Sequence, residues 1–135
     1  MSKPVILCVD DEAIVLNSLK IQLKKEFNDN YFYELAESAD EAMEILEELQ
    51  ADKADIVVIV SDWLMPGLKG DEFLIWVHKN YPNVIKIMLT GQADESAIER
   101  AKEQASLHAC LHKPMSPTSN INFMSIRTVE LNSSH

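Results

Sequence analysis

The sequence predicts an α/β fold in which helices cover both faces of a parallel β-sheet. Short apolar runs alternate with longer amphipathic stretches along most of the chain, as strands alternate with crossover helices. The first and third runs are almost unbroken Val, Ile and Leu, which is typical of strands buried on both faces. The five expected strands are 5–9, 31–35, 56–60, 84–89 and 107–111.

Between these runs, the apolar residues recur at helical spacing. The stretch 12–27 carries an apolar stripe after the first strand. Ser38 and Glu41 form the pattern of a capping box, with Ser38 as the cap and Glu41 reaching back, so a second helix begins there. A third helix ends near Asn80, because a proline follows two residues later, and a fourth covers 93–105.

The overall composition suits one compact domain of ordinary globular type. The chain has 135 residues, 47% of them hydrophobic and 25% charged. The net charge of −10 argues against a nucleic-acid surface, because phosphate contacts need clusters of Lys and Arg. It fits a protein that binds cations or docks on a basic partner, and solubility alone also explains it.

The location is expected to be cytoplasmic, without membrane contact. The start of the chain shows no signal peptide, and no apolar run is long enough to span a bilayer. Cys8 and Cys110 both lie inside apolar runs, and two buried thiols fit a reducing compartment.

Asp, Thr or Lys residues stand at the ends of four of the five expected strands. Asp10 and Asp11 follow the first strand, Asp62 follows the third, Thr90 the fourth and Lys113 the fifth. In a parallel sheet these ends share one edge, where ligands bind at the topological switch point. If the first and third strands are neighbours, the three carboxylates converge at that edge.

Such a cluster favours phosphoryl-transfer chemistry. Three convergent carboxylates need compensation to stay ionised, and Mg²⁺, which prefers oxygen ligands, supplies it. Lys113 adds a mobile positive charge and Thr90 a hydroxyl, both suited to a phosphoryl oxygen. A carboxylate nucleophile beside a metal and a lysine can transfer phosphoryl groups by positioning and charge neutralisation. Taken alone, Asp10 and Asp11 could instead cap the first helix.

The motifs occur in a fixed order, each at a strand end. They are Val9-Asp10-Asp11, Ser61-Asp62-Trp63-Leu64-Met65-Pro66-Gly67, Gly70, Leu89-Thr90-Gly91 and His112-Lys113-Pro114. This pattern resembles the receiver domain of two-component response regulators, over most of the chain. Each short motif is weak by itself, and the specificity comes from finding all of them in order.

The resemblance implies a fold and a function. The fold would be a doubly wound, flavodoxin-like three-layer sandwich with strand order 2-1-3-4-5, formed by a receiver core at 1–114. Asp62 would accept a phosphoryl group from the phosphohistidine of a sensor histidine kinase or phosphotransfer protein, and the domain would then switch conformation to control a partner or output. It would catalyse its own phosphoryl transfer and dephosphorylation without being an enzyme in the usual sense.

The resemblance also assigns the site residues. Asp10, Asp11, Asp62 and the backbone carbonyl of Leu64 would hold Mg²⁺. Thr90 and Lys113 would contact the phosphoryl group as the remaining catalytic residues.

Two features depart from the family pattern. Cys110 stands three residues before the lysine, where many receivers carry a Tyr or Phe that acts as a rotating switch. The segment 115–135 does not look like the usual fifth amphipathic helix, and a short helix, an extended arm and disorder remain open for it. A partner, a homodimer that exchanges tails, or a non-native chain end could each replace that helix.

Two other functions remain as alternatives. A pseudo-receiver would bind partners without being phosphorylated, although its carboxylates would normally be eroded. An Asp-nucleophile, Mg-dependent phosphatase would carry a second Asp two residues after the nucleophile, where this chain has Leu64. The sequence leaves the cognate kinase, the pathway and the output open. It also leaves open whether the chain is a stand-alone regulator or part of a longer one.

Overall fold

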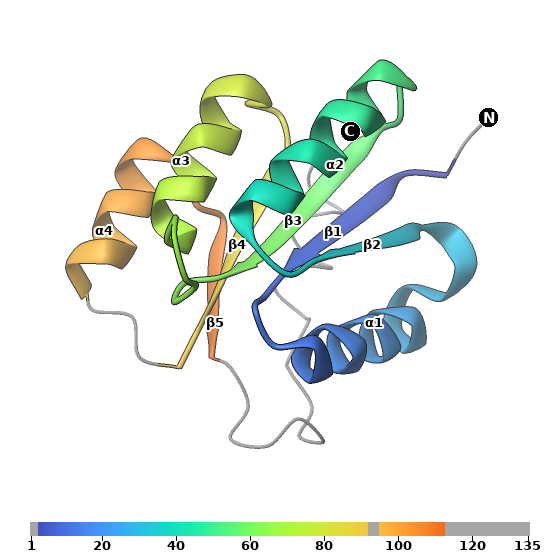
Figure 1. Ribbon diagram of the computed structural model, residues 1–135, viewed down its shortest axis with the longest axis horizontal. Helices are drawn as coiled ribbons and strands as arrows, with labels where there is room; N and C mark the ends of the chain where they lie inside the picture. The colour runs from blue at the N-terminus through green and yellow to red at the C-terminus, as the bar shows by residue number, and fades with distance from the viewer. Residues whose placement is uncertain (1–2, 92–94, 113–135) are drawn as a thin grey trace.

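The computed structural model describes residues 3–91 and 95–112, which form a single parallel sheet between two helical layers. The strand order is β2-β1-β3-β4-β5, and all neighbouring strands are parallel. Helix α1 covers one face of the sheet, and α2, α3 and α4 cover the other (Figure 1). This arrangement confirms the doubly wound α/β class and the order 2-1-3-4-5. The strands are β1 Val5–Val9, β2 Phe32–Ala36, β3 Ile56–Asp62, β4 Ile85–Thr90 and β5 Ala109–His112; the helices are α1 Ala13–Phe27, α2 Ala39–Ala51, α3 Gly70–Asn80 and α4 Glu95–Gln104, with a short 3₁₀ turn at Asn28–Asn30.

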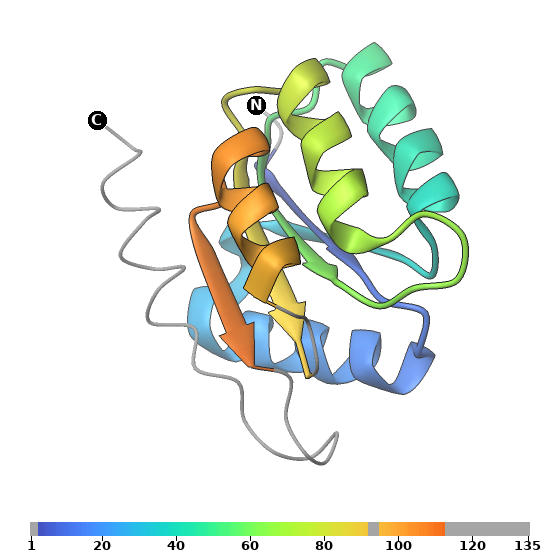
Figure 2. The same ribbon diagram turned by 90° about the vertical axis from the view of Figure 1, so that its left-hand side faces the viewer.

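Successive residues of each central strand point alternately into the two apolar layers. On β1, Ile6 and Cys8 pack under α1, whereas Leu7 and Val9 face α2 and α3. All four of these side chains are fully buried, which explains why the run contains no polar residue. Figure 2, turned by 90°, shows α1 on the opposite side of the sheet from α3 and α4. The two layers hold the ends of β1 and β3 in fixed positions side by side.

The strand ends differ from the sequence prediction by one or two residues. Strand β3 continues through Ser61 to Asp62, because Asp62 still pairs with Leu89 of β4. Strand β5 begins at Ala109 and not at 107. The reason is His108, whose ring Nδ1 accepts the backbone N–H of Lys86 at 3.1 Å in place of a ladder carbonyl. Part of the predicted fourth helix, 93–94, lies outside the described residues, and α4 is described from Glu95.

The predicted cap of the second helix is confirmed. Ser38 is the N-cap of α2, and its hydroxyl accepts the Glu41 N–H at 3.1 Å. The Glu41 carboxylate reaches back to the N–H of Glu37, one residue earlier than in the standard capping box. None of the helices described here combines the length and apolar character needed to cross a membrane.

Candidate functional site

Three carboxylates converge at the common end of β1 and β3. The register pairs Val9 with Ser61, so the chain leaves both strands at the same edge of the sheet. One carboxylate oxygen from each of Asp10, Asp11 and Asp62 lies within 4.8 Å of the other two. Residues some fifty positions apart in the sequence are thus brought to one point by strand adjacency.

The three acids differ in their exposure to solvent. Asp10 is fully buried and Asp62 is 4% exposed, whereas Asp11 is exposed. Asp10 is oriented by backbone groups: its N–H donates to the Ala36 carbonyl, and its Oδ1 accepts the Glu12 N–H at 2.9 Å. Glu12 is the N-cap of α1, so Asp10 also supports the entry to the first helix. The N-cap is neither Asp10 nor Asp11, so the helix-capping interpretation of these two residues is wrong.

An open pocket of about 570 Å³ lies over this edge of the sheet. Its lining includes Asp11, Asp62, Trp63, Leu64, Pro66 and Gly91. Leu64 is 55% exposed, whereas Met65 next to it is buried. A small charged group can therefore reach Asp62 from solvent through this pocket.

The loop after Asp62 is fixed by backbone hydrogen bonds. The Trp63 N–H donates to the Leu89 carbonyl at 2.9 Å, and the Trp63 carbonyl accepts the Gly70 N–H at 2.8 Å. Gly70 has no room for a side chain, since a Cβ there would lie 2.1 Å from the carbonyl oxygen of Asp62. The first residue of α3 thus packs directly against the end of β3. In the turn between them, Gly67 adopts a φ of +82°, a conformation that favours glycine.

Thr90 is the last residue of β4 and is 4% exposed. It stands one residue beyond Leu89, the partner of Asp62, so it belongs to the same edge of the sheet. Lys113, Pro114 and the segment 115–135 lie outside the described residues. The structure therefore brings together Asp10, Asp11, Asp62 and Thr90 at one edge, and the position of Lys113 stays a prediction.

Cys110 occupies the place where many receivers have an aromatic switch residue. It is half-buried on β5, opposite Met88 of β4, and packs against the apolar layer under α2, α3 and α4. Burial raises the pKa of its thiol. The short, uncharged side chain adds to the apolar layer at this place.

Sequence reasoning missed two residues near the site. Asp71, in the first turn of α3, is completely buried, and its carboxylate contacts both the Trp63 indole and Arg100 of α4. An acidic residue in the first turn of a helix is common and normally faces solvent, so its position in the sequence does not single it out. Arg100 lies among Glu and Lys residues in α4 and looks like part of a solvated helix face.

Comparison with known proteins identifies the family. Residues 6–123 match the profile described as "Response regulator receiver domain". The chain belongs to this family. Among solved structures, this receiver domain is similar to the signal receiver domain of an HD domain-containing protein from Pseudomonas fluorescens Pf-5, at 23% identity and a TM-score of 0.81, with 98% of each chain covered. It is also similar to a CheY-like response regulator receiver domain protein from Methanospirillum hungatei JF-1, at 27% identity and a TM-score of 0.75, covering 98% of this chain and 95% of the other.

The curated relatives are longer proteins. The receiver domain is 32% identical over 112 residues to the hydrogenase transcriptional regulatory protein HoxA of Cupriavidus necator, covering 83% of this chain and 21% of that protein. It is 28% identical over 115 residues to the sensor kinase CckA of Brucella abortus, covering 85% of this chain and 11% of that protein. The chain thus spans about a fifth and a tenth of these relatives, and it shares with them a receiver module of two-component systems.

Proposed function

We propose that this receiver domain accepts a phosphoryl group on Asp62 from the phosphohistidine of a sensor histidine kinase or phosphotransfer protein. The observation that carries the proposal is the convergence of Asp10, Asp11 and Asp62 within 4.8 Å, at a pocket open to solvent. Asp62 is held at the end of a buried strand and lines that pocket. A donor can approach it from outside while the backbone stays fixed.

The donor set fits a magnesium ion. Mg²⁺ binds through one or two carboxylates plus phosphate oxygens and retains several waters, which an open acidic pocket allows. Asp10, Asp11, Asp62 and the backbone carbonyl of Leu64 would hold it. When bound, it neutralises part of the carboxylate charge and stabilises the charge on the transferring phosphoryl group. The buried Asp10, oriented by the Glu12 N–H, would fix the inner side of this site.

The chain's own residues would carry the transfer itself. A carboxylate oxygen of Asp62 attacks phosphorus, the bond from phosphorus to the donor imidazole nitrogen breaks, and that nitrogen keeps the electron pair. The products are an aspartyl phosphate and a free histidine. The Thr90 hydroxyl and the Lys113 ammonium would donate hydrogen bonds to the phosphoryl oxygens, and water would later hydrolyse the acyl phosphate.

Phosphorylation would act as a conformational switch. The new charge and its hydrogen bonds favour one arrangement of Thr90 and the loop that follows it, and this shifts a two-state equilibrium. The face of α4, which follows that loop, would then present the change to a partner or an output domain in the cytoplasm. The phosphatase alternative lacks its second acid, because Leu64 stands there, and the intact acid cluster argues against a pseudo-receiver.

The proposal is tested by labelling with a small phosphodonor. The protein is incubated with acetyl phosphate and Mg²⁺, and intact mass is measured for wild type, Asp62→Ala and the control Asp55→Asn. Asp55 is exposed and precedes the opposite end of β3, so its variant should label like the wild type. We expect one acid-stable, base-labile phosphate, absent from Asp62→Ala and absent when Mg²⁺ is chelated. An unlabelled wild type, or equal labelling of Asp62→Ala, would reject the proposed function.

A further inference from the structure

The side chain of Trp63 is held at two points beside the acceptor. Trp63 directly follows Asp62 and lines the acceptor pocket. Its indole Nε1–H donates to Oδ1 of Asp71 at 3.1 Å, and the Lys69 ammonium lies 5.3 Å from the centre of its ring. The indole therefore forms a wall of the pocket whose orientation depends on residues at the start of α3.

Because the backbone of Trp63 is fixed, the orientation of its ring depends on side-chain contacts. The Trp63 N–H and carbonyl are both engaged, with Leu89 and Gly70, so the backbone cannot turn to carry the ring elsewhere. The ring is half-buried, which leaves part of it accessible from solvent. Rotation about its side-chain bonds remains the available motion, and the hydrogen bond to Asp71 opposes it.

Asp71 is itself tied to a second helix. Its side chain is fully buried, and a buried carboxylate is costly unless it is paired and hydrogen-bonded. Oδ2 forms an ion pair with Arg100 of α4, while Oδ1 accepts the Trp63 indole N–H. Helices α3 and α4 lie side by side on the same face of the sheet (Figures 1 and 2). One carboxylate thus joins the pocket wall to α4.

We propose that Asp71 is a positioning residue that fixes the Trp63 indole as a wall of the acceptor pocket, and that its ion pair with Arg100 makes this wall depend on α4. The inference rests on the proposed function, because the pocket is the proposed site of phosphorylation. The Arg100 side chain is 46% exposed, so a partner with an acidic group can reach it from solvent. If the partner separates Arg100 from Asp71, the Trp63 indole is less firmly held. By linkage, a change at the pocket would then alter the affinity of that partner.

The first test reports on Trp63 without any phosphorylation. The chain has two tryptophans, so Trp76→Phe leaves Trp63 as the only one, and its fluorescence quenching by acrylamide measures exposure of the indole. In this background, Asp71→Leu and Arg100→Gln should raise the quenching constant up to about two-fold, because a half-buried ring becomes accessible. Asp71→Asn should fall between the parent and Asp71→Leu, since an amide oxygen still accepts the indole N–H but the ion pair with Arg100 is lost. Glu99→Gln, next to Arg100 and exposed, is the matched control.

The second test asks whether the wall matters for the acceptor. The labelling rate of Asp62 is measured against acetyl phosphate concentration, and Asp71→Leu and Arg100→Gln should shift the concentration for half-maximal rate by roughly two-fold or more. Glu99→Gln should leave it unchanged. If the wild type takes up no phosphate, the proposed function fails, whereas the quenching result still decides whether Asp71 positions Trp63.

Several outcomes would overturn the inference. Unchanged quenching in Asp71→Leu, alongside lowered thermal stability, would show that Asp71 has a purely structural role. Equal effects of Glu99→Gln and Arg100→Gln would show that Arg100 has no specific role in linking α4 to the pocket wall. If Asp71→Leu does not fold, the half-exposed Arg100→Gln decides the matter, and parental values in both assays would refute the link to α4.

Discussion

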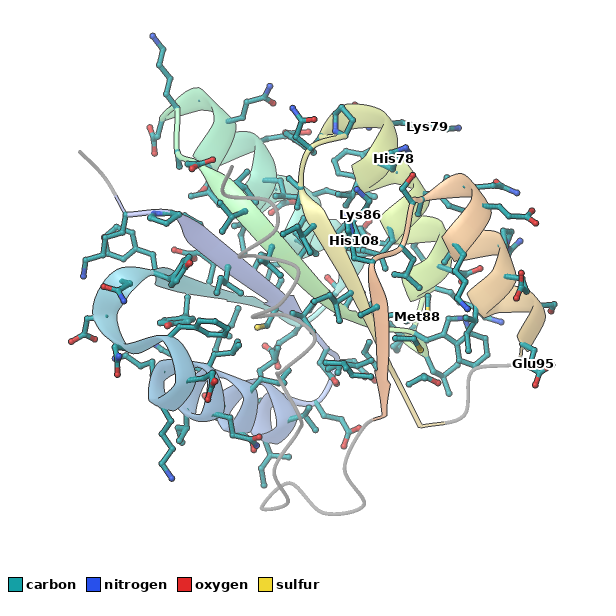
Figure 3. The ribbon with its side chains drawn as sticks, turned by 180° about the vertical axis from the view of Figure 1, so that it is seen from behind. His78, Lys79, Lys86, Met88, Glu95 and His108 are labelled. Atoms are coloured by element: carbon teal, nitrogen blue, oxygen red, sulfur yellow. The ribbon has the colours of Figure 1, made fainter. Side chains whose placement is uncertain are left out.

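Lys86 has a side chain that lies wholly inside the protein. It is 0% exposed on β4, and its ammonium donates to the Val84 carbonyl at 2.7 Å. That carbonyl is its only side-chain hydrogen-bond partner within residues 3–91 and 95–112. Burial lowers the pKa of Lys86, because the charged form loses its hydration. In Figure 3, Lys86 and His108 lie together where β4 and β5 begin, with His78 of α3 nearby.

Replacing this lysine should stabilise the domain. Lys86→Met keeps an unbranched side chain of similar length and removes the cost of burying an amine with few partners. We expect the free energy of unfolding at pH 7 to rise by about 1–3 kcal/mol. Urea denaturation of wild type, Lys86→Met and the exposed control Lys79→Met measures this. A lower stability of Lys86→Met would show that the buried amine makes a net favourable contribution.

His108 should make the stability of the domain depend on pH. Its Nδ1 accepts the Lys86 backbone N–H and so carries no proton. Burial, and then the charges of Lys86 and His78, lower the pKa of His108 in the folded state. Below the ordinary histidine pKa of about 6.5, the unfolded chain takes up a proton that the folded chain resists. Stability is therefore complete above that pH and falls as the pH drops toward the lowered pKa of the folded state.

The variant His108→Asn isolates this contribution. The Asn oxygen can accept the same N–H but does not titrate in this range. We expect the loss of unfolding free energy between neutral and mildly acidic pH to be smaller in His108→Asn than in the wild type. Denaturant titrations at several pH values provide the measurement. Identical pH slopes in the two proteins would contradict the assignment.

At the scale of whole elements, the start of α3 sets the position of β3, the strand that ends at Asp62. A Cβ at Gly70 would meet the carbonyl oxygen of Asp62 at 2.1 Å and the Cα of Trp63 at 2.8 Å, and neither backbone atom can move freely. Gly70→Ala should therefore destabilise the domain by about 1–3 kcal/mol and slow labelling of Asp62. Gly91→Ala is the control, because a Cβ there meets no atom of residues 3–91 and 95–112 within 4 Å, although Gly91 also lines the pocket. Equal effects of the two substitutions would show that close approach at Gly70 is not what matters.

The elements could be predicted from the sequence wherever one local pattern determines them. Buried strands read as apolar runs, and the Ser38 cap marks the start of α2, so their positions follow from spacing alone. The acid cluster followed from the shared edge of parallel strands. The burial of Lys86 could not be predicted, because a lysine in a strand is normally turned to solvent. The contact of Trp63, Asp71 and Arg100 depends on how α3 packs against α4, which no short-range pattern encodes.

The whole molecule carries a net charge of −10, and three of its carboxylates meet at one point. Like charges this close raise the free energy of the folded state relative to the unfolded chain, in which Asp62 is far from Asp10 and Asp11. A cation that binds the folded state alone therefore stabilises it by mass action, by about 2.7 kcal/mol at a hundred times the dissociation constant. We expect Mg²⁺ to raise the thermal midpoint of the wild type well above the value in NaCl of equal ionic strength.

The variants locate this effect within the molecule. Asp11→Asn and Asp62→Asn should melt higher than the wild type without Mg²⁺, because each removes one of the crowded charges, and should respond less to the ion. Asp55→Asn also removes one negative charge but stands beside the other end of β3, so its response to Mg²⁺ should match the wild type. Differential scanning fluorimetry over a range of Mg²⁺ concentrations gives all four curves. A shift that persists in Asp11→Asn and Asp62→Asn would mean that the ion acts on the acidic surface as a whole and not at the carboxylate cluster.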